Sequence, residues 1–118
     1  PQSGEASYTG IITKEDGRIN WNESAEVIEA KIRAYYPEPG CWCMENGLPL
    51  RILEASVFSG TFEGTAGTVL EFSKRDGILI KTGDGILAVK KLQRQGKNAM
   101  DYKSFMNGAR NFIGTVLV

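Results

Sequence analysis

The chain has 118 residues, of which 42% are hydrophobic and 24% charged, a composition typical of one globular domain and not of a disordered segment. Its apolar runs are too short to span a membrane. It contains no histidine, which excludes Ser–His, Cys–His and His–metal arrangements. Cys41 and Cys43 are its two cysteines and provide too few ligands for zinc, so we expect reduced thiols, no metal site and no catalytic residue in this chain.

The formal net charge is zero, but the charges are distributed unevenly along the chain. Residues 1–66 hold 5 Lys and Arg against 10 Asp and Glu, a net charge of −5. Residues 67–118 hold 9 Lys and Arg against 4 Asp and Glu, a net charge of +5. Charge separated in this way can create a one-sided field even though the sum vanishes.

Residues 1–10 are small and polar and predict a linker or extended arm, followed by one domain over residues 11–118. The sequence starts at Pro1 and not at methionine, so we expect it to be a fragment of a longer protein. The first regular element is a helix over residues 24–36, with Ser24 as N-cap. Apolar residues recur at helical spacing and predict a buried stripe. The stripe comprises Ala25, Ile28, Ile32 and Tyr35.

Beyond Gly40 the apolar pattern changes to that of short strands. Residues 41–58 predict a hairpin that turns at Asn46-Gly47, a dipeptide that favours the positive φ angles of a two-residue turn. A glycine-rich loop then precedes three short strand-like segments. These segments lie at residues 67–72, 76–82 and 85–93. Strands this short and this closely spaced favour a small closed or partly closed barrel.

The last elements are a short helix over residues 101–108 and a final strand-like segment over residues 112–118. Asp101 can cap the N-terminus of the helix, and Gly108 can end it in a left-handed conformation.

The strand-like segment that starts at Ile86 is apolar on both faces and becomes basic at Lys90 and Lys91. Cations in the flanking turns extend this basic run, and we expect them to form one rim of the barrel. The seven residues, which fall within 24 positions, are Lys74, Arg75, Lys81, Lys90, Lys91, Arg94 and Lys97. Such a rim would bind a polyanion by releasing condensed counterions, although solvated surface lysines produce the same pattern. No pair of exposed aromatics lies among these cations. Any contact with a nucleic acid should therefore depend on the backbone and shape of that nucleic acid and not on its base sequence.

Several separated motifs give the chain a resemblance to the C-terminal domains of methionyl-tRNA formyltransferases, from about Thr9 to the end. They occur in the family's order and spacing. The matching positions are Ile19-Asn20-Trp21, Ile32-Arg33-Ala34, Pro37, Pro39 and Gly40, and then Gly96-Lys97, Met100, Phe105 and Gly108. Two departures stand out: Asn20 replaces an aspartate of the family, and Asn98 and Ala99 stand where relatives often have basic residues.

The resemblance implies a mainly β fold, an open Greek-key barrel of the oligonucleotide-binding type, with an N-terminal helix and a short C-terminal helix. It also implies a cytoplasmic enzyme with an N-terminal catalytic domain that binds 10-formyltetrahydrofolate and formylates initiator methionyl-tRNA. The barrel would hold the tRNA backbone through the seven cations and would bind no cofactor itself. Two alternatives stay open: the equivalent barrel of another formyltetrahydrofolate-dependent formyltransferase or hydrolase, and a module that only braces the catalytic domain.

Overall fold

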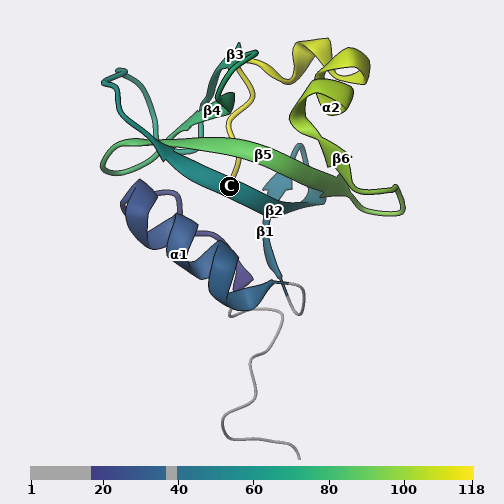
Figure 1. The fold of residues 1–118 in the computed structure, drawn as a ribbon, viewed down its shortest axis with the longest axis horizontal. Helices are drawn as coiled ribbons and strands as arrows, with labels where there is room; N and C mark the ends of the chain where they lie inside the picture. The colour runs from purple at the N-terminus through teal and green to yellow at the C-terminus, as the bar shows by residue number, and fades with distance from the viewer. Residues whose placement is uncertain (1–16, 37–39) are drawn as a thin grey trace, which may run out of the picture.

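The computed structural model describes residues 17–36 and 40–118, so the predicted arm over residues 1–10 lies outside the described part (Figure 1). Helix α1 (Ala25–Tyr35) begins where the sequence predicts, because the Ser24 side chain accepts a hydrogen bond from the backbone N–H of Val27 at 3.2 Å. Its predicted stripe faces the core: Ala25, Ile28 and Ile32 are buried, and Tyr35 packs against the core from a half-buried position.

A six-stranded antiparallel sheet follows, and its first five strands occur where the sequence predicts them. The sixth, Met100–Asp101, was not predicted, and the final strand-like segment over residues 112–118 forms an isolated bridge from Val116 to Thr68 in place of a regular strand. The strands are β1 (Cys41–Glu45), β2 (Leu48–Phe58), β3 (Val69–Ser73), β4 (Gly77–Lys81), β5 (Ile86–Arg94) and β6 (Met100–Asp101). The order across the sheet is β1-β2-β5-β4-β3, and β6 pairs with β5. Strands β3, β4 and β5 form a meander, and β2 lies beside β5, which is the Greek-key arrangement.

The β1–β2 hairpin turns at the predicted dipeptide. Asn46 has a φ of 51° and Gly47 a φ of 86°, so both central residues adopt the left-handed conformations that a tight hairpin turn requires. The turn fixes the register of the hairpin, with Cys41 opposite Ile52 and Cys43 opposite Leu50. Four side chains of this hairpin therefore point into the core.

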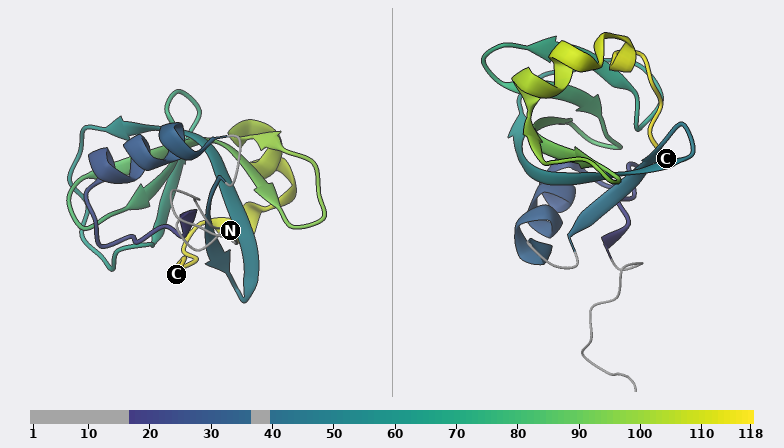
Figure 2. Two further views of the ribbon diagram at one scale, coloured as in Figure 1. Left: turned by 90° about the horizontal axis from the view of Figure 1, so that it is seen from below. Right: turned by 90° about the vertical axis from the view of Figure 1, so that its right-hand side faces the viewer.

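The C-terminal segment connects the two edges of the curled sheet. Leu117 N–H donates to the Gly67 carbonyl and Val69 N–H donates to the Thr115 carbonyl, both at 2.8 Å, beside β3. On the other edge, Val118 exchanges two backbone hydrogen bonds with Met44 of β1, at 2.7 and 3.1 Å. The edge strands thus meet through this segment and not by direct pairing, which agrees with the expected open barrel, whose strands curl around the core (Figure 2).

The two helices cover different sides of this sheet. Helix α1 packs beneath β2 and β5, whereas α2 (Tyr102–Gly108) lies above β5 next to the β3–β4 hairpin (Figure 1). Asp101 caps α2 as predicted, because its carboxylate accepts from the Ser104 backbone N–H at 2.8 Å and this contact lowers the pKa of Asp101. The predicted left-handed stop at Gly108 is wrong: the helix is capped by Ala109 at φ −140° and continues into a 3-10 turn, η2 (Arg110–Phe112).

The barrel interior is apolar and holds both thiols. Burial raises the pKa of Cys41 to about 11 and that of Cys43 to about 12, so both stay protonated at neutral pH. Neither sulfur is in a disulfide, as expected from their spacing. Within residues 17–36 and 40–118, neither helix combines the length and the apolar character that crossing a membrane requires.

Candidate nucleic-acid interface

The side chains of Lys90 and Lys91, which are adjacent in β5, lie on different sides of the sheet. Pairing with β2 shifts register here, because Lys91 lies opposite Glu54 whereas Val89 lies opposite Ala55, which leaves Lys90 as the extra residue of a bulge. Lys90 reaches toward the β3–β4 turn, where its Nζ donates to the Asp76 carbonyl oxygen. Lys91 is exposed and lines a hollow against α1.

The β3–β4 turn holds two exposed cations in a fixed loop. Asp76 closes the turn, because the Ser73 hydroxyl accepts from the Asp76 backbone N–H and donates to the Asp76 carboxylate, both at 3.1 Å. Lys74 and Arg75 occupy the two central positions and are exposed. The carbonyl of Lys74 accepts a hydrogen bond from the Tyr102 hydroxyl at 2.8 Å, which ties this turn to the first residue of α2.

Tyr102 is the centre of a basic cluster that joins this turn to α2. Its ring packs against Phe72 with centroids 5.9 Å apart. The ammonium groups of Lys90 and Lys103 lie 5.9 and 5.8 Å from the centroid of the same ring, within cation–π range. We call these two lysines, together with the two exposed cations of the β3–β4 turn that Tyr102 contacts through the Lys74 carbonyl, the Tyr102 patch. Its members are Lys74, Arg75, Lys90 and Lys103.

Lys97 lies on the other side of α2, in the turn between β5 and β6. Gly96 makes this turn with a φ of 77°, and the Lys97 backbone N–H donates to the Arg94 carbonyl at 3.0 Å. The exposed side chain of Lys97 borders a hollow of about 260 Å³ that it shares with Phe105 and Gly108. Lys97 and the Tyr102 patch therefore flank the same short helix.

Arg94 is partly exposed and pairs with a buried acid. It donates two hydrogen bonds to the buried carboxylate of Glu45, at 2.6 and 3.0 Å, and this contact raises the pKa of Arg94. Its guanidinium also lies 4.7 Å from the ring centroid of Phe105. Since Glu45 is only 7% exposed, Arg94 neutralises a buried charge and holds β5 to the end of β1.

The seven predicted cations do not share one rim. The structure gathers Lys74, Arg75 and Lys90, and it places Lys97 on the other side of α2, in the β5–β6 turn. Lys81 lies at the opposite end of β4 from the β3–β4 turn, where its Nζ donates to the Thr82 carbonyl at 2.9 Å. Two ordinary features of strands cause the separation: successive side chains point to opposite faces, which parts Lys90 from Lys91, and Lys81 stands at the other end of β4 from Lys74 and Arg75.

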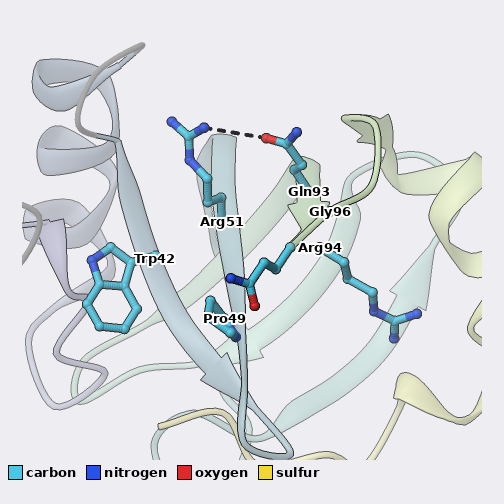
Figure 3. A pocket seen from close by; sticks show the side chains of 7 residues that line it. Trp42, Pro49, Arg51, Gln93, Arg94 and Gly96 are labelled. Carbon is cyan, nitrogen blue, oxygen red and sulfur yellow. Dashed lines mark hydrogen bonds between the residues drawn. The ribbon is translucent and has the colours of Figure 1, made fainter.

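A second polar hollow lies on the outer face of β1, β2 and β5 (Figure 3). Arg51 and Gln93 border it on one side, joined by a 3.4 Å hydrogen bond, and Trp42 and Pro49 form its apolar walls. Arg94 points away from the other lining side chains, in keeping with its pairing to Glu45.

The sequence interpretation missed Tyr102, Lys103 and the residues of this hollow. A signal for the first two was present, since Tyr102-Lys103 is an aromatic residue next to a base at the start of a capped helix. The hollow had no local signal, because Trp42, Arg51 and Gln93 come together only through strand register.

Comparison with known proteins places this geometry in a family. The family described as "Formyl transferase, C-terminal domain" matches residues 11–110 of the chain. A methionyl-tRNA formyltransferase of Treponema denticola is 42% identical over 117 residues, covering 95% of this chain and 36% of the relative. Proteins of the same name from Rickettsia massiliae and Neisseria meningitidis serogroup C are 40% and 39% identical, each with 37% of its length covered. The chain thus spans little more than a third of the curated relatives it matches.

Solved structures share the fold at lower sequence similarity. HypX from Aquifex aeolicus, in a complex with tetrahydrofolic acid, matches with a TM-score of 0.70 and 16% identity, covering 86% of this chain and 18% of that protein. This likeness concerns the fold alone. The match over residues 11–110 and the motifs that carry it show that the chain belongs to the family of formyl transferase C-terminal domains.

Proposed function

We propose that the chain is the C-terminal domain of a methionyl-tRNA formyltransferase and binds the phosphate backbone of initiator methionyl-tRNA through the Tyr102 patch. The observation that supports this most is that Tyr102 holds three basic elements together: Lys90 and Lys103 lie over its ring, and its hydroxyl binds the backbone of the β3–β4 turn that carries Lys74 and Arg75. The names of its relatives supply the substrate.

The proposed contact is electrostatic. Each ammonium or guanidinium that neutralises a phosphate releases a counterion, so affinity falls as salt rises. The carboxylates closest in sequence to the patch have other partners: Asp76 accepts from Ser73, and Asp101 caps α2. Four cations against these two carboxylates leave this surface net positive. Such a surface recognises the course of a backbone and does not read base edges.

The patch narrows the set of cations expected from the sequence. Lys74, Arg75 and Lys90 remain in the proposed contact, Lys103 joins them, and Lys97 extends the surface across α2. We assign Arg94 to holding β5 to the end of β1 through Glu45. Lys81 and Lys91 lie outside the proposed contact, at the far end of β4 and against α1.

The proposal includes a partner domain. Because the chain resembles the family, we infer that the same protein has an N-terminal catalytic domain and acts in the cytoplasm. That domain would bind 10-formyltetrahydrofolate and transfer its formyl group to the amino group of the methionine. The barrel would present the tRNA to that domain and bind no cofactor. Among the described residues, no three His, Cys, Asp or Glu side chains are grouped as a metal site requires.

The neighbouring lysines of β5 provide a matched test. Lys90→Gln should weaken binding of initiator methionyl-tRNA to the purified chain about fivefold and reduce the slope of log K against log salt by about one, because one phosphate contact is lost. Lys91→Gln removes the same charge one residue away, on the α1 side, and should change the affinity less than twofold. Filter binding between about 50 and 200 mM salt measures both quantities, and circular dichroism checks the fold.

If Lys90→Gln and Lys91→Gln lower the affinity for tRNA equally, the assignment of the tRNA contact to the Tyr102 patch is contradicted. If the unsubstituted chain shows no affinity for tRNA above that for a DNA duplex of similar charge, the proposed function fails. The barrel of a formyltransferase or hydrolase with a different substrate would then be the better description.

A further inference from the structure

The hollow between α2 and the β5–β6 turn combines an apolar floor with a basic rim. Leu92 and Phe105 line it from the core, and the exposed Met100 and polar residues of the turn complete it. Its volume of about 260 Å³ is just below the ~300–1,000 Å³ of most small-molecule sites, so it suits one planar group. We propose that this hollow receives the base of a single unpaired nucleotide of the RNA, a contact separate from the backbone contact of the Tyr102 patch.

The pairing of β5 with β6 builds the floor of this hollow. Met100 lies opposite Leu92, and the side chains of opposite residues lie on the same face of a sheet. Leu92 is fully buried, whereas Met100 is 42% exposed at the edge of the sheet. The ring of Phe105 closes the floor from α2, held edge-on against Phe112 with centroids 5.0 Å apart. The open thioether of Met100 therefore offers a flat ring an apolar and polarisable surface.

The polar side chains of the hollow have unused donors. Arg94 binds Glu45 through Nε and Nη2, and its Nη1 donates to no other group in the described part of the chain. Lys97 and Asn98 are exposed, and neither side chain makes a hydrogen bond or ion pair with another described residue. An amide can donate to and accept from the edge of a base, and an ammonium can neutralise the phosphate next to it.

Charge favours an RNA over a peptide as the occupant. Arg94 and Lys97 line the hollow, and among the described residues no Asp or Glu does. The turn that carries Lys97 is fixed, because Gln93 Nε2 donates to the Lys97 carbonyl at 2.9 Å. A cation held at the mouth of an apolar hollow matches a nucleotide, which joins a flat ring to an anion.

Position agrees with this occupant. The hollow lies on the Lys97 side of α2, and the Tyr102 patch lies on the other side. An RNA backbone that contacts both therefore passes the mouth of the hollow. A base inside a duplex cannot enter, because its faces are stacked and its edge is paired, whereas an unpaired base can turn out of the strand. This inference rests on the proposed function and adds one unpaired nucleotide beside the β5–β6 turn.

Gly108 allows the hollow to be filled without a change of charge. This glycine lines the hollow, its φ is not positive, and a Cβ added to it would meet no heavy atom within 4 Å. Gly108→Leu should therefore block the hollow and leave α2 intact. The matched control is Asn107→Leu, which adds the same side chain one residue earlier, at an exposed position outside the lining.

Two probes separate the base contact from the backbone contact. The first is a fluorescein-labelled single-stranded octauridine, and the second is an RNA duplex of eight base pairs, each titrated with the purified chain. Gly108→Leu should weaken binding of the single strand about tenfold and that of the duplex less than about twofold, because only a base contact is lost. Asn98→Ala should weaken binding of the single strand about fivefold, the usual worth of one hydrogen bond. Asn107→Leu should affect neither probe.

A photocrosslink in the unsubstituted chain locates the nucleotide directly. With 4-thiouridine in the single strand, crosslinks should map to Met100 or residues 96–98. Crosslinks only outside these positions, or unchanged affinity of the single strand in both Gly108→Leu and Asn98→Ala, would overturn the inference and leave the hollow to an apolar side chain of a protein partner. Binding of tRNA and the duplex without binding of the single strand would also overturn it, yet leave the proposed function standing. A chain that binds no tRNA contradicts the proposed function itself.

Discussion

Replacing Lys74, Arg75 and Lys103 together by glutamine should lower the affinity of the chain for initiator methionyl-tRNA about 100-fold at moderate salt and reduce the salt slope by about three. The three side chains are exposed, and the hydrogen bonds that position this surface come from other groups. Tyr102 binds the carbonyl of Lys74 and not its side chain, so the turn should keep its structure in the variant. Filter binding at several salt concentrations measures both effects.

A second triple variant controls for net charge. Lys81→Gln, Lys91→Gln and Arg33→Gln remove the same three charges from the far end of β4, the α1 side of β5 and α1 itself. This variant should lose less than about fivefold in affinity, because cations farther than a Debye length from the phosphates are screened. If the two triple variants weaken binding equally, only the total charge matters and the patch has no special role.

Leu117→Ala should lower the free energy of unfolding by about 2–5 kcal/mol, the usual cost of removing a buried leucine side chain. Leu117 is 1% exposed and belongs to the core cluster, and it stands in the segment that joins the edges of the sheet at β1 and β3. Loosening this segment exposes both edge strands. Urea denaturation followed by circular dichroism measures the change.

Val116 offers the matched control for this prediction. It is the preceding residue of the same segment, pairs with Thr68 through its backbone, and is 47% exposed. Val116→Ala should change the free energy of unfolding by less than about 0.5 kcal/mol, as surface substitutions usually do. Similar effects of the two substitutions would show that Leu117 does not join the edges of the sheet through its buried side chain.

The fold was predictable where local chemistry determines it. Ser24 and Asp101 cap the helices that they were expected to cap, and Asn46-Gly47 turns the hairpin. The order of the strands in the sheet follows from the family resemblance and not from local signals. Gly108 shows the limit of local rules, because the chain continues into a 3-10 turn after α2 and needs no left-handed residue there.

The candidate site was less predictable, because contacts between distant residues determine it. Lys90 and Lys91 were expected on one rim, but successive side chains of a strand point to opposite faces, so Lys90 reaches the β3–β4 turn whereas Lys91 lies beside α1. Arg94 was expected to contact phosphate, and its pairing with Glu45, a residue 49 positions earlier, is a contact that no local pattern indicates. Tyr102 meets the Lys74 carbonyl across 28 positions. Basic composition thus pointed to the C-terminal half of the chain, whereas the packing of α2 against the β3–β4 turn defines which side chains belong to the proposed patch.

The most direct test of the account is a map of amide chemical-shift changes in the ¹⁵N-labelled chain on addition of initiator methionyl-tRNA. The account predicts the largest changes at residues 74–76, at Lys90 and Lys97, and at residues 102–104 around the start of α2. It predicts small changes along α1 and at residues 81–85. Changes concentrated on α1, Lys91 and Lys81, with residues 74–76 and 102–104 unaffected, would contradict it.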